Sequence, residues 1–106
     1  MANIFEVIDP RGFKVICTEE QWNNHILGKR AWMKGWEQEI QKIISEPLMI
    51  CQDPDFEDRN VYYRRPSRRR LYLKAIVLIT KDLNGFIISA FPCDSCKSGE
   101  KLIWPN

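Results

Sequence analysis

The chain lacks the long apolar segment of a membrane-spanning or exported protein. Its longest uninterrupted apolar run, Ala75 to Ile79, is far short of the roughly 20 residues that a helix needs to cross a bilayer. No signal peptide is visible, because the short apolar run from Phe5 to Ile8 is interrupted by Glu6. These absences predict a cytoplasmic chain that does not interact with membranes.

Histidine and net charge are also scarce. The chain has one histidine in 106 residues, and no HxH or HExxH pattern indicates a His-based metal site. Its 16 Lys+Arg and 14 Asp+Glu leave a net charge of only +2, while 44% of its residues are hydrophobic. That balance excludes general disorder and is typical of a soluble globular protein. The length predicts a single domain, residues 1–106, with one modest core.

Four cysteines are expected to be reduced thiols, since nothing marks the chain for export. Cys17 and Cys51 lie in predicted strands, where they fit as small apolar residues. Cys93 and Cys96 have CxxC spacing, which leaves three interpretations open: plain packing of the tail, half of a zinc site or a disulfide, and a redox pair. A zinc site needs two further ligands, and a redox CxxC normally opens a helix, whereas the residues after Cys96 predict a loop. We therefore predict no metal and no cofactor.

The first half of the chain predicts a β-hairpin followed by two helices. The hairpin occupies residues 1–17, with the turn signal Asp9-Pro10-Arg11-Gly12 between its strands. Thr18 is a good N-cap for the first helix, which stops near Gly28. The second helix is expected from Lys34 to Ser45, so the helical region covers 18–46.

The second half, residues 47–92, predicts an antiparallel sheet. Asp82 to Gly85 is expected to form the hairpin turn between its last two strands, with Asn84-Gly85 as the marker. The tail, residues 93–106, is expected to be a loop in which Trp104 folds back on the body. The order β-β-α-α-β-β-β-β predicts an α+β fold with two N-terminal helices packed on one face of the sheet. The other face is then left for binding.

Charge is concentrated in two adjacent stretches of opposite sign. Four carboxylates lie between 53 and 58, and six arginines and one lysine lie between 59 and 74 with no acidic residue among them. Guanidinium groups match phosphate oxygens, and interleaved tyrosines stack on unpaired bases. The predicted RNA-binding residues are Arg59, Arg65, Arg68, Arg69, Arg70, Tyr63 and Tyr72. The alternative is a solvated turn whose arginines pair with the acidic loop, which itself lacks the glycine and terminal glutamate of a calcium site.

Side-chain alternation places some of these groups on common faces. Tyr62 and Arg64 share one side of their strand, and Tyr72 and Lys74 share one side of the next. If those sides align with each other and with Ser89 in the last strand, the five side chains line one groove. Strand register decides whether they do.

His25 lies beside the apolar stripe of the first helix, which carries Trp22 and Ile26. A lone histidine is more often structural than catalytic. Imidazole nevertheless titrates near neutrality and can move a proton to or from a ribose hydroxyl. RNA cleavage without metal needs such a group, cations for the charge on the phosphate oxygens, and a hydrogen-bond donor. The arginines, lysine and tyrosines of this chain supply the remaining groups.

Several motifs in order carry a resemblance to a known group of nucleases. They are Thr18-Glu-Glu-Gln-Trp-Asn-Asn-His25-Ile26-Leu27, a helix ending Ile43-Ile44-Ser45-Glu46-Pro47, Asn60-Val-Tyr62-Tyr63-Arg64, Leu71-Tyr-Leu73-Lys74-Ala-Ile-Val77 and Gly85-Phe-Ile-Ile-Ser89-Ala90-Phe91-Pro92. Over residues 4–92 the chain resembles the phage-associated branch of the barnase–EndoU–colicin E/D–RelE-like (BECR) nuclease superfamily. The resemblance implies an α+β fold and metal-independent endoribonuclease activity, often in a toxin or phage-related effector.

The resemblance also implies roles for single residues. His25 matches the histidine of the family's helix motif, the acid or base. Arg64 matches a phosphate-holding residue, and Ser89 matches a hydrogen-bond donor in the last strand. Lys74 is a further match, while Tyr62 joins the catalytic set from alternation alone. Many members have a second histidine followed by Pro-Glu, where this chain has Gly28-Lys-Arg30-Ala-Trp32.

Three functions follow from these patterns. The expected one is an endoribonuclease that cleaves single-stranded RNA, tRNA or mRNA through attack of the 2′-OH. The second is a non-catalytic RNA- or ribosome-binding module that uses the arginine-rich stretch 59–74. The third is a protein-interaction domain whose basic surface meets an acidic partner, such as a cognate antitoxin or immunity protein.

Overall fold

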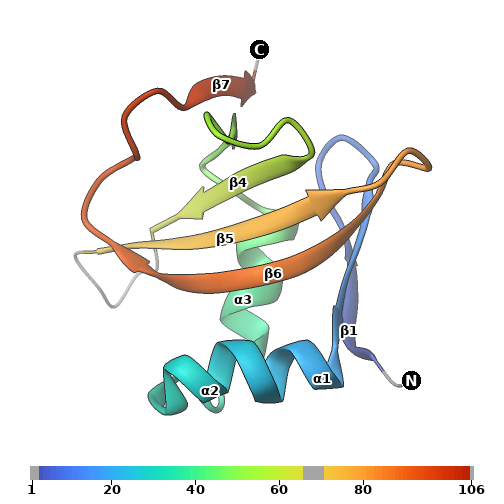
Figure 1. Ribbon diagram of the computed structural model, residues 1–106, viewed down its shortest axis with the longest axis vertical. Coiled ribbons are helices and arrows are strands. Elements are labelled where there is room, and N and C mark those ends of the chain that lie inside the picture. Colours follow the sequence, from blue (N-terminus) through green and yellow to red (C-terminus); the bar gives the residue numbers. More distant parts are fainter. Residues whose placement is uncertain (1–2, 66–70, 106) are drawn as a thin grey trace.

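The computed structural model describes residues 3–65 and 71–105, and within them seven strands form one sheet (Figure 1). The strands are β1 (Asn3–Ile8), β2 (Lys14–Thr18), β3 (Met49–Gln52), β4 (Arg59–Arg64), β5 (Tyr72–Ile79), β6 (Asn84–Cys93) and β7 (Lys101–Trp104). Their order across the sheet is β1-β2-β6-β5-β4-β3-β7. The helical elements are α1 (Glu19–Gln21), the π-helical η1 (Trp22–Ile26), α2 (Leu27–Lys29), the 3-10 turn η2 (Ala31–Met33) and α3 (Glu37–Ser45).

The architecture is α+β, as the order of predicted elements indicated. The predicted N-terminal hairpin is present, since β1 and β2 pair antiparallel. The expectation of a wholly antiparallel sheet is wrong at one place, where β2 runs parallel to β6 with Lys14 beside Asn84 and Ile16 beside Phe86. The hairpin joins the sheet through a strand about 70 residues away in sequence, and alternation carries no signal for the direction of such a pairing.

The first helix begins at the predicted N-cap, but the second helix is shorter than predicted. Thr18 is the N-cap of α1, and its hydroxyl accepts a hydrogen bond from the Gln21 amide at 3.1 Å. The second helix begins at Glu37 rather than Lys34, because Gly35 has a φ of +92° and the Trp36 amide bonds to the Met33 carbonyl in a tight turn. Chain reversal at Gly35 therefore shortens α3 by one turn at its start.

The predicted hairpin turn between β5 and β6 is present, but it lies earlier than the expected Asp82–Gly85, because Asn84 and Gly85 both belong to β6. The turn lies just before them, where Leu83 has a φ of 61° and its amide bonds to the Thr80 carbonyl. Gly85 is needed for a close approach instead. A Cβ there would lie 2.7 Å from Val77 Cγ1 and 3.1 Å from Val15 Cγ2, so only glycine lets β6 pack between its neighbours at this point.

The predicted loop at the C-terminus is also corrected. Strand β6 continues to Cys93, and Lys101–Trp104 forms β7, which pairs antiparallel with β3 and covers that edge of the sheet. Trp104 does fold back on the body, where it packs against the core. Four residues are too few to show the alternation of apolar and polar side chains that predicts a strand. The partner of β7 is the edge of β3, and the two meet only in the folded chain.

Helix α3 lies behind the sheet in Figure 1, and the connection from β6 to β7 rises at the left of the view. Ile40, Ile43 and Ile44 of α3 are fully buried in the main core, and each such side chain stabilises the fold by roughly 1.5–3 kcal/mol. A second cluster, Cys51, Val61 and Tyr63, lies on the opposite face, called the front face below. None of the helices in the described ranges is long and apolar enough to cross a membrane.

Candidate active site

The helical segment that carries His25 runs along the free edge of β6. At its start the Gln21 side-chain amide donates a hydrogen bond to the Ile88 carbonyl. After its end the Arg30 guanidinium stacks on Phe91, 4.8 Å from the ring centroid. Ile88 and Phe91 both belong to β6, whose pairing with β2 covers only its first residues. The segment between the two contacts therefore passes beside Ser89.

His25 lies about one turn after Gln21, the residue whose side chain contacts β6. It follows Gln21 by four residues, and residues four apart are neighbours on one side of a helix. Trp22 and Ile26 are buried and hold the segment in the core, whereas His25 is exposed. The turn is π-helical, a geometry frequent at functional sites. An accessible imidazole is thus carried by a segment that runs beside the second half of β6.

The front face next to this edge carries an aromatic ring between two cations. Lys74 is paired with Phe91 on one side and with Tyr63 on the other, so the three side chains share the front face. The Lys74 Nζ lies 5.5 Å from the centroids of both rings. Ser89 is paired with Ile76 and lies on the same face. Arg30 contacts Phe91 from the helical segment, which brings a second cation to the ring.

The charge of Lys74 is neutralised where it lies. Its Nζ is 3.6 Å from Glu100 Oε2, and the two side chains are 9% and 2% exposed. The other oxygen of Glu100 accepts a hydrogen bond from the Tyr63 hydroxyl. Burial first, and then this bond to the carboxylate, raise the pKa of Tyr63. Arg30, which is half-buried, is therefore the cation closer to solvent at this edge.

The predicted groove of five polar side chains does not form. Tyr62 is paired with Ala75 and Arg64 with Leu73, which places both on the α3 side, whereas Lys74 and Ser89 lie on the front face. Arg64 donates a hydrogen bond to the Glu46 carbonyl at the end of α3. It therefore caps the helix C-terminus, where a cation is favourable. Register, which the sequence does not encode locally, separates the two halves of the predicted set.

Tyr62 belongs to a buried polar network beneath the β1–β2 turn. Its hydroxyl donates to Asp9 Oδ2 at 2.6 Å and accepts from Arg11 Nη2 at 2.9 Å. Arg11 also bonds to the Asn60 side chain at 2.9 Å. Tyr62 is fully buried, and burial, followed by its bond to Asp9, raises its pKa. Contact with RNA at this hydroxyl would require the turn to open.

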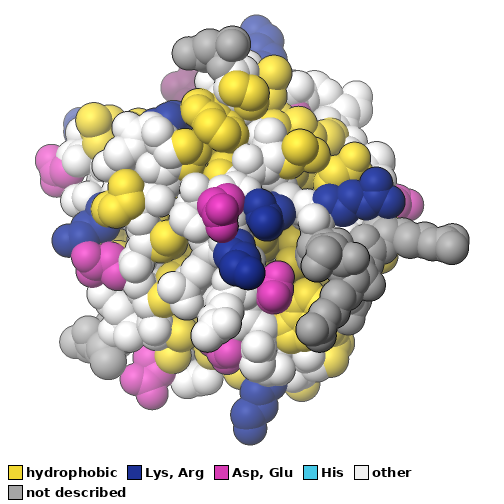
Figure 2. All heavy atoms as spheres, turned by 180° about the vertical axis from the view of Figure 1, so that it is seen from behind, with side chains coloured by type: hydrophobic (Ala, Val, Ile, Leu, Met, Phe, Trp, Pro, Cys, Tyr) yellow, Lys and Arg dark blue, Asp and Glu magenta, His cyan; other side chains and the backbone are white. Residues whose placement is uncertain are grey.

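The acidic and basic stretches lie at opposite ends of β4. The carboxylates precede Arg59, which stacks on Phe56 at 3.9 Å from the ring centroid, while the exposed Arg65 follows the far end of the strand. Arg65 therefore cannot pair with the acidic loop within one chain. Arg68, Arg69 and Arg70 lie outside the described residues. Tyr72 is half-buried on the front face. The view from behind, onto the α3 side, shows side chains of both charges interspersed (Figure 2).

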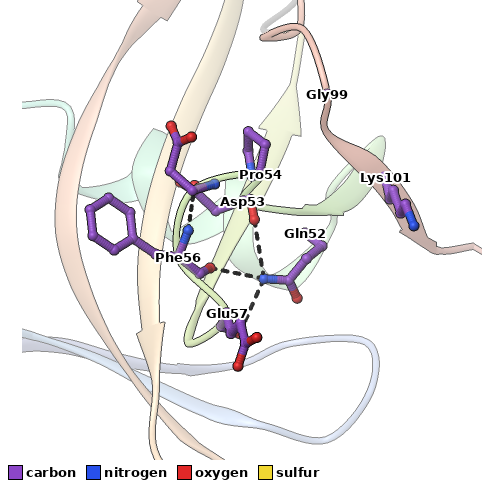
Figure 3. A pocket seen from close by; sticks show the side chains of 8 residues that line it. Gln52, Asp53, Pro54, Phe56, Glu57, Gly99 and Lys101 are labelled. Atoms are coloured by element: carbon purple, nitrogen blue, oxygen red, sulfur yellow. Dashed lines mark hydrogen bonds between the residues drawn. The ribbon is translucent and has the colours of Figure 1, made fainter.

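The acidic loop lines an open cavity of about 490 Å³ with Gly99 and Lys101 (Figure 3). Two of its four carboxylates, those of Asp53 and Asp55, already have partners. Asp53 Oδ1 accepts hydrogen bonds from the Asp55 and Phe56 amides, and Asp55 forms an ion pair with Lys97 at 2.6 Å. Within 3–65 and 71–105, no group of three His, Cys, Asp or Glu side chains is arranged to hold a metal ion. The loop is thus organised by its own hydrogen bonds.

Two residues of the candidate site, Arg30 and Phe91, are absent from the predicted set. The sequence could have indicated Phe91, because it lies two residues after Ser89 in the same strand and therefore points to the same face of the sheet. Arg30 follows His25 by five residues in a basic pair, but only the tertiary contact with Phe91 distinguishes it from Lys29. No protein-family model, curated protein sequence or solved structure matches the chain.

Proposed function

We propose that the chain is a metal-independent endoribonuclease whose reaction takes place at the β6 edge beside His25. One observation carries the proposal: the contacts Gln21–Ile88 and Arg30–Phe91 hold the segment of an exposed histidine alongside a strand that presents a hydroxyl and an aromatic ring. The two adjacent segments carry an acid–base group, a cation and a hydrogen-bond donor, which is the set that RNA cleavage without metal requires.

In the proposed reaction, His25 accepts the proton of the ribose 2′-OH. The 2′ oxygen then attacks the adjacent phosphorus, and the bond to the 5′ oxygen breaks. That oxygen takes a proton from water, and His25 returns the proton that it accepted to water. The products are a 2′,3′-cyclic phosphate and a free 5′-OH. The Arg30 guanidinium balances the charge on the phosphate oxygens, and the Ser89 hydroxyl donates a hydrogen bond to one of them. Lys74, neutralised by Glu100, positions Phe91 as a stacking surface for a base.

Binding of the RNA strand is proposed to extend from this site to the basic end of β4. Arg65 is exposed there, and the sequence that follows it contains three further arginines. Such contacts to phosphates weaken as salt rises, by a slope of about −0.7 per phosphate neutralised on a single strand. A non-catalytic RNA-binding module and a domain bound by an acidic inhibitor protein are the alternatives that the experiment must separate.

The test is incubation of the purified chain with total RNA and tRNA in EDTA, with His25→Ala and Arg30→Ala alongside. We expect cleavage by the wild type and a rate about 10²- to 10⁴-fold lower for His25→Ala, which is the usual contribution of a general acid or base. Lys29→Ala is the matched control for Arg30→Ala, because Lys29 is its exposed neighbour, and it should retain nearly full activity.

The outcomes distinguish the three functions. Binding of RNA without cleavage by any variant would replace the enzyme with the binding module. If the chain neither binds nor cleaves RNA but tightly captures an acidic protein, the interaction domain is favoured. Equal cleavage by wild type and His25→Ala would overturn the role of His25.

A further inference from the structure

Two of the four cysteines lie at the end of β6 and just after it, and a third lies in β3. Cys93 is the last residue of β6, Cys96 follows three residues later, and Cys51 lies in β3. Burial is the main cause of the raised pKa of Cys51 and of Cys93, and Cys96 contributes a smaller part to each. The three thiols differ in their exposure to solvent: Cys96 is exposed, Cys93 is half-buried and Cys51 is buried.

The segment that carries Cys96, residues 94–100 and called the strap below, is fixed at several points. The Lys97 amide donates to Glu100 Oε1 at 3.2 Å, and the Lys97 side chain is paired with Asp55. Glu100 is held under the strap by Tyr63 and Lys74. At Gly99 the strap passes so close to the acidic loop that a Cβ would lie 3.2 Å from Pro54 Cβ. Cys96 is therefore presented to solvent from an anchored segment.

Neither core packing nor zinc binding accounts well for the CxxC spacing. Packing does not explain Cys96, since an exposed thiol contributes little to a core. Zinc would need further ligands, and among the described residues no set of three suitable side chains is arranged around an ion. A pair of thiols three residues apart, one exposed and one half-buried, fits thiol–disulfide exchange.

We propose that Cys93 and Cys96 form an oxidisable dithiol, which a small disulfide such as oxidised glutathione converts into an intramolecular disulfide. The Cys96 thiolate attacks one sulfur of the oxidant, forming a mixed disulfide and releasing one glutathione thiolate. The Cys93 thiolate then attacks Cys96 Sγ and releases the second glutathione. The protein loses two electrons and two protons, and the oxidant becomes two thiols.

The disulfide ties the start of the strap to the end of β6. The strap in turn holds Glu100 over Tyr63 and Lys74 and leads into β7. Restricting its start reduces local opening of this region, so oxidation slows amide hydrogen exchange in the strap and β7. The dithiol uses none of the residues of the proposed ribonuclease reaction, and its test does not depend on that activity.

The experiment is incubation of the folded chain with oxidised glutathione, followed by intact-mass measurement and peptide mapping. We expect the wild type to lose two hydrogens without keeping glutathione, with the link between residues 93 and 96. Cys93→Ser should accumulate a stable glutathione adduct on Cys96, because the resolving thiol is gone. Cys96→Ser should react at least tenfold more slowly, because the remaining thiols are buried or half-buried.

Cys51→Ser is the control that separates this pair from the third thiol, and it should form the same disulfide as the wild type. Folding of each variant is checked by circular dichroism before the reaction. A disulfide that maps to Cys51 would overturn the proposal. So would a persistent glutathione adduct on the wild type, or a wild type that stays reduced while the chain unfolded in urea is oxidised.

Discussion

The Tyr62 hydroxyl is held between two charged side chains in the interior. Its bonds to Asp9 and Arg11 link the β1–β2 turn to β4, and Asp9 itself is 3% exposed. Tyr62→Phe removes the donor and leaves a buried carboxylate short of one partner. We expect the free energy of unfolding to fall by about 1.5–3 kcal/mol, the usual range for a hydrogen bond to a charged group, as measured by urea denaturation.

Tyr72→Phe is the matched control, because Tyr72 is half-buried on the other face of the sheet. Its effect should stay within about 0.5 kcal/mol, as for most substitutions away from a buried network. Equal losses in the two variants would contradict the stabilising role of the Asp9–Arg11–Tyr62 network.

Gly85 matters because of what surrounds it in the sheet, although it has no side chain of its own. Gly85→Ala places a Cβ against Val77 and Val15, so β6 must shift or two valines must change rotamer. We expect a loss of about 1–3 kcal/mol in the free energy of unfolding, in the range for overpacked cores. The measurement is thermal or urea denaturation.

Gly28→Ala is the comparison for Gly85→Ala, because its nearest new contact is the Asn23 carbonyl oxygen at 3.6 Å. Alanine is favoured over glycine in a helix by up to about 1 kcal/mol, so this variant should be neutral or more stable. A destabilised Gly28→Ala together with an unaffected Gly85→Ala would reverse the expected roles of the two glycines.

At the scale of an element, one buried carboxylate helps to anchor the strap, which leads into β7. Glu100 bonds to Tyr63 and pairs with Lys74 under the strap. Glu100→Gln leaves the Lys74 charge buried without a counter-charge, and breaking a buried pair in this way costs about 3–5 kcal/mol. We expect a loss of this order in urea denaturation and faster amide exchange in β7.

The double variant Glu100→Gln/Lys74→Met tests the cause of that loss. Because methionine carries no charge, it should recover more than half of the stability lost in Glu100→Gln. A double variant as unstable as the single one would assign the loss to the Tyr63 hydrogen bond instead.

At the scale of the whole molecule, several acidic groups are buried in their neutral forms. Burial raises the pKa of Cys17 from 9.0 to about 12, and burial followed by Glu100 raises that of Cys51 to about 11. The unfolded chain loses these protons at lower pH than the folded chain does. Above the unfolded pKa values the folded state therefore binds more protons, and the free energy of unfolding falls as pH rises.

We expect the free energy of unfolding to be insensitive to these groups below about pH 8 and to decline from about pH 9 towards 12, because an ordinary thiol titrates near 8.5. Urea denaturation at a series of pH values measures it. In Cys17→Ala the decline should be shallower, since one of the contributing groups is absent. Identical slopes for wild type and variant would exclude Cys17 as a cause.

The sequence by itself determined the local features of this protein. Thr18 as an N-cap, the Ile40, Ile43 and Ile44 stripe, the first hairpin and the α+β class all follow from periodicity and capping, which act within a few residues. It also singled out His25 and Ser89, and the fold brings the helical segment of one alongside the strand of the other.

Only the tertiary structure decided which of these features meet. Register moved Tyr62 and Arg64 to the face away from Lys74, the packing of β2 against β6 gave Gly85 a role different from a turn, and the open edge of β3 converted the tail into a strand. The Arg30–Phe91 contact likewise joins residues 61 positions apart. Pairings between distant segments depend on packing and on closing long loops, and neither leaves a trace in local periodicity.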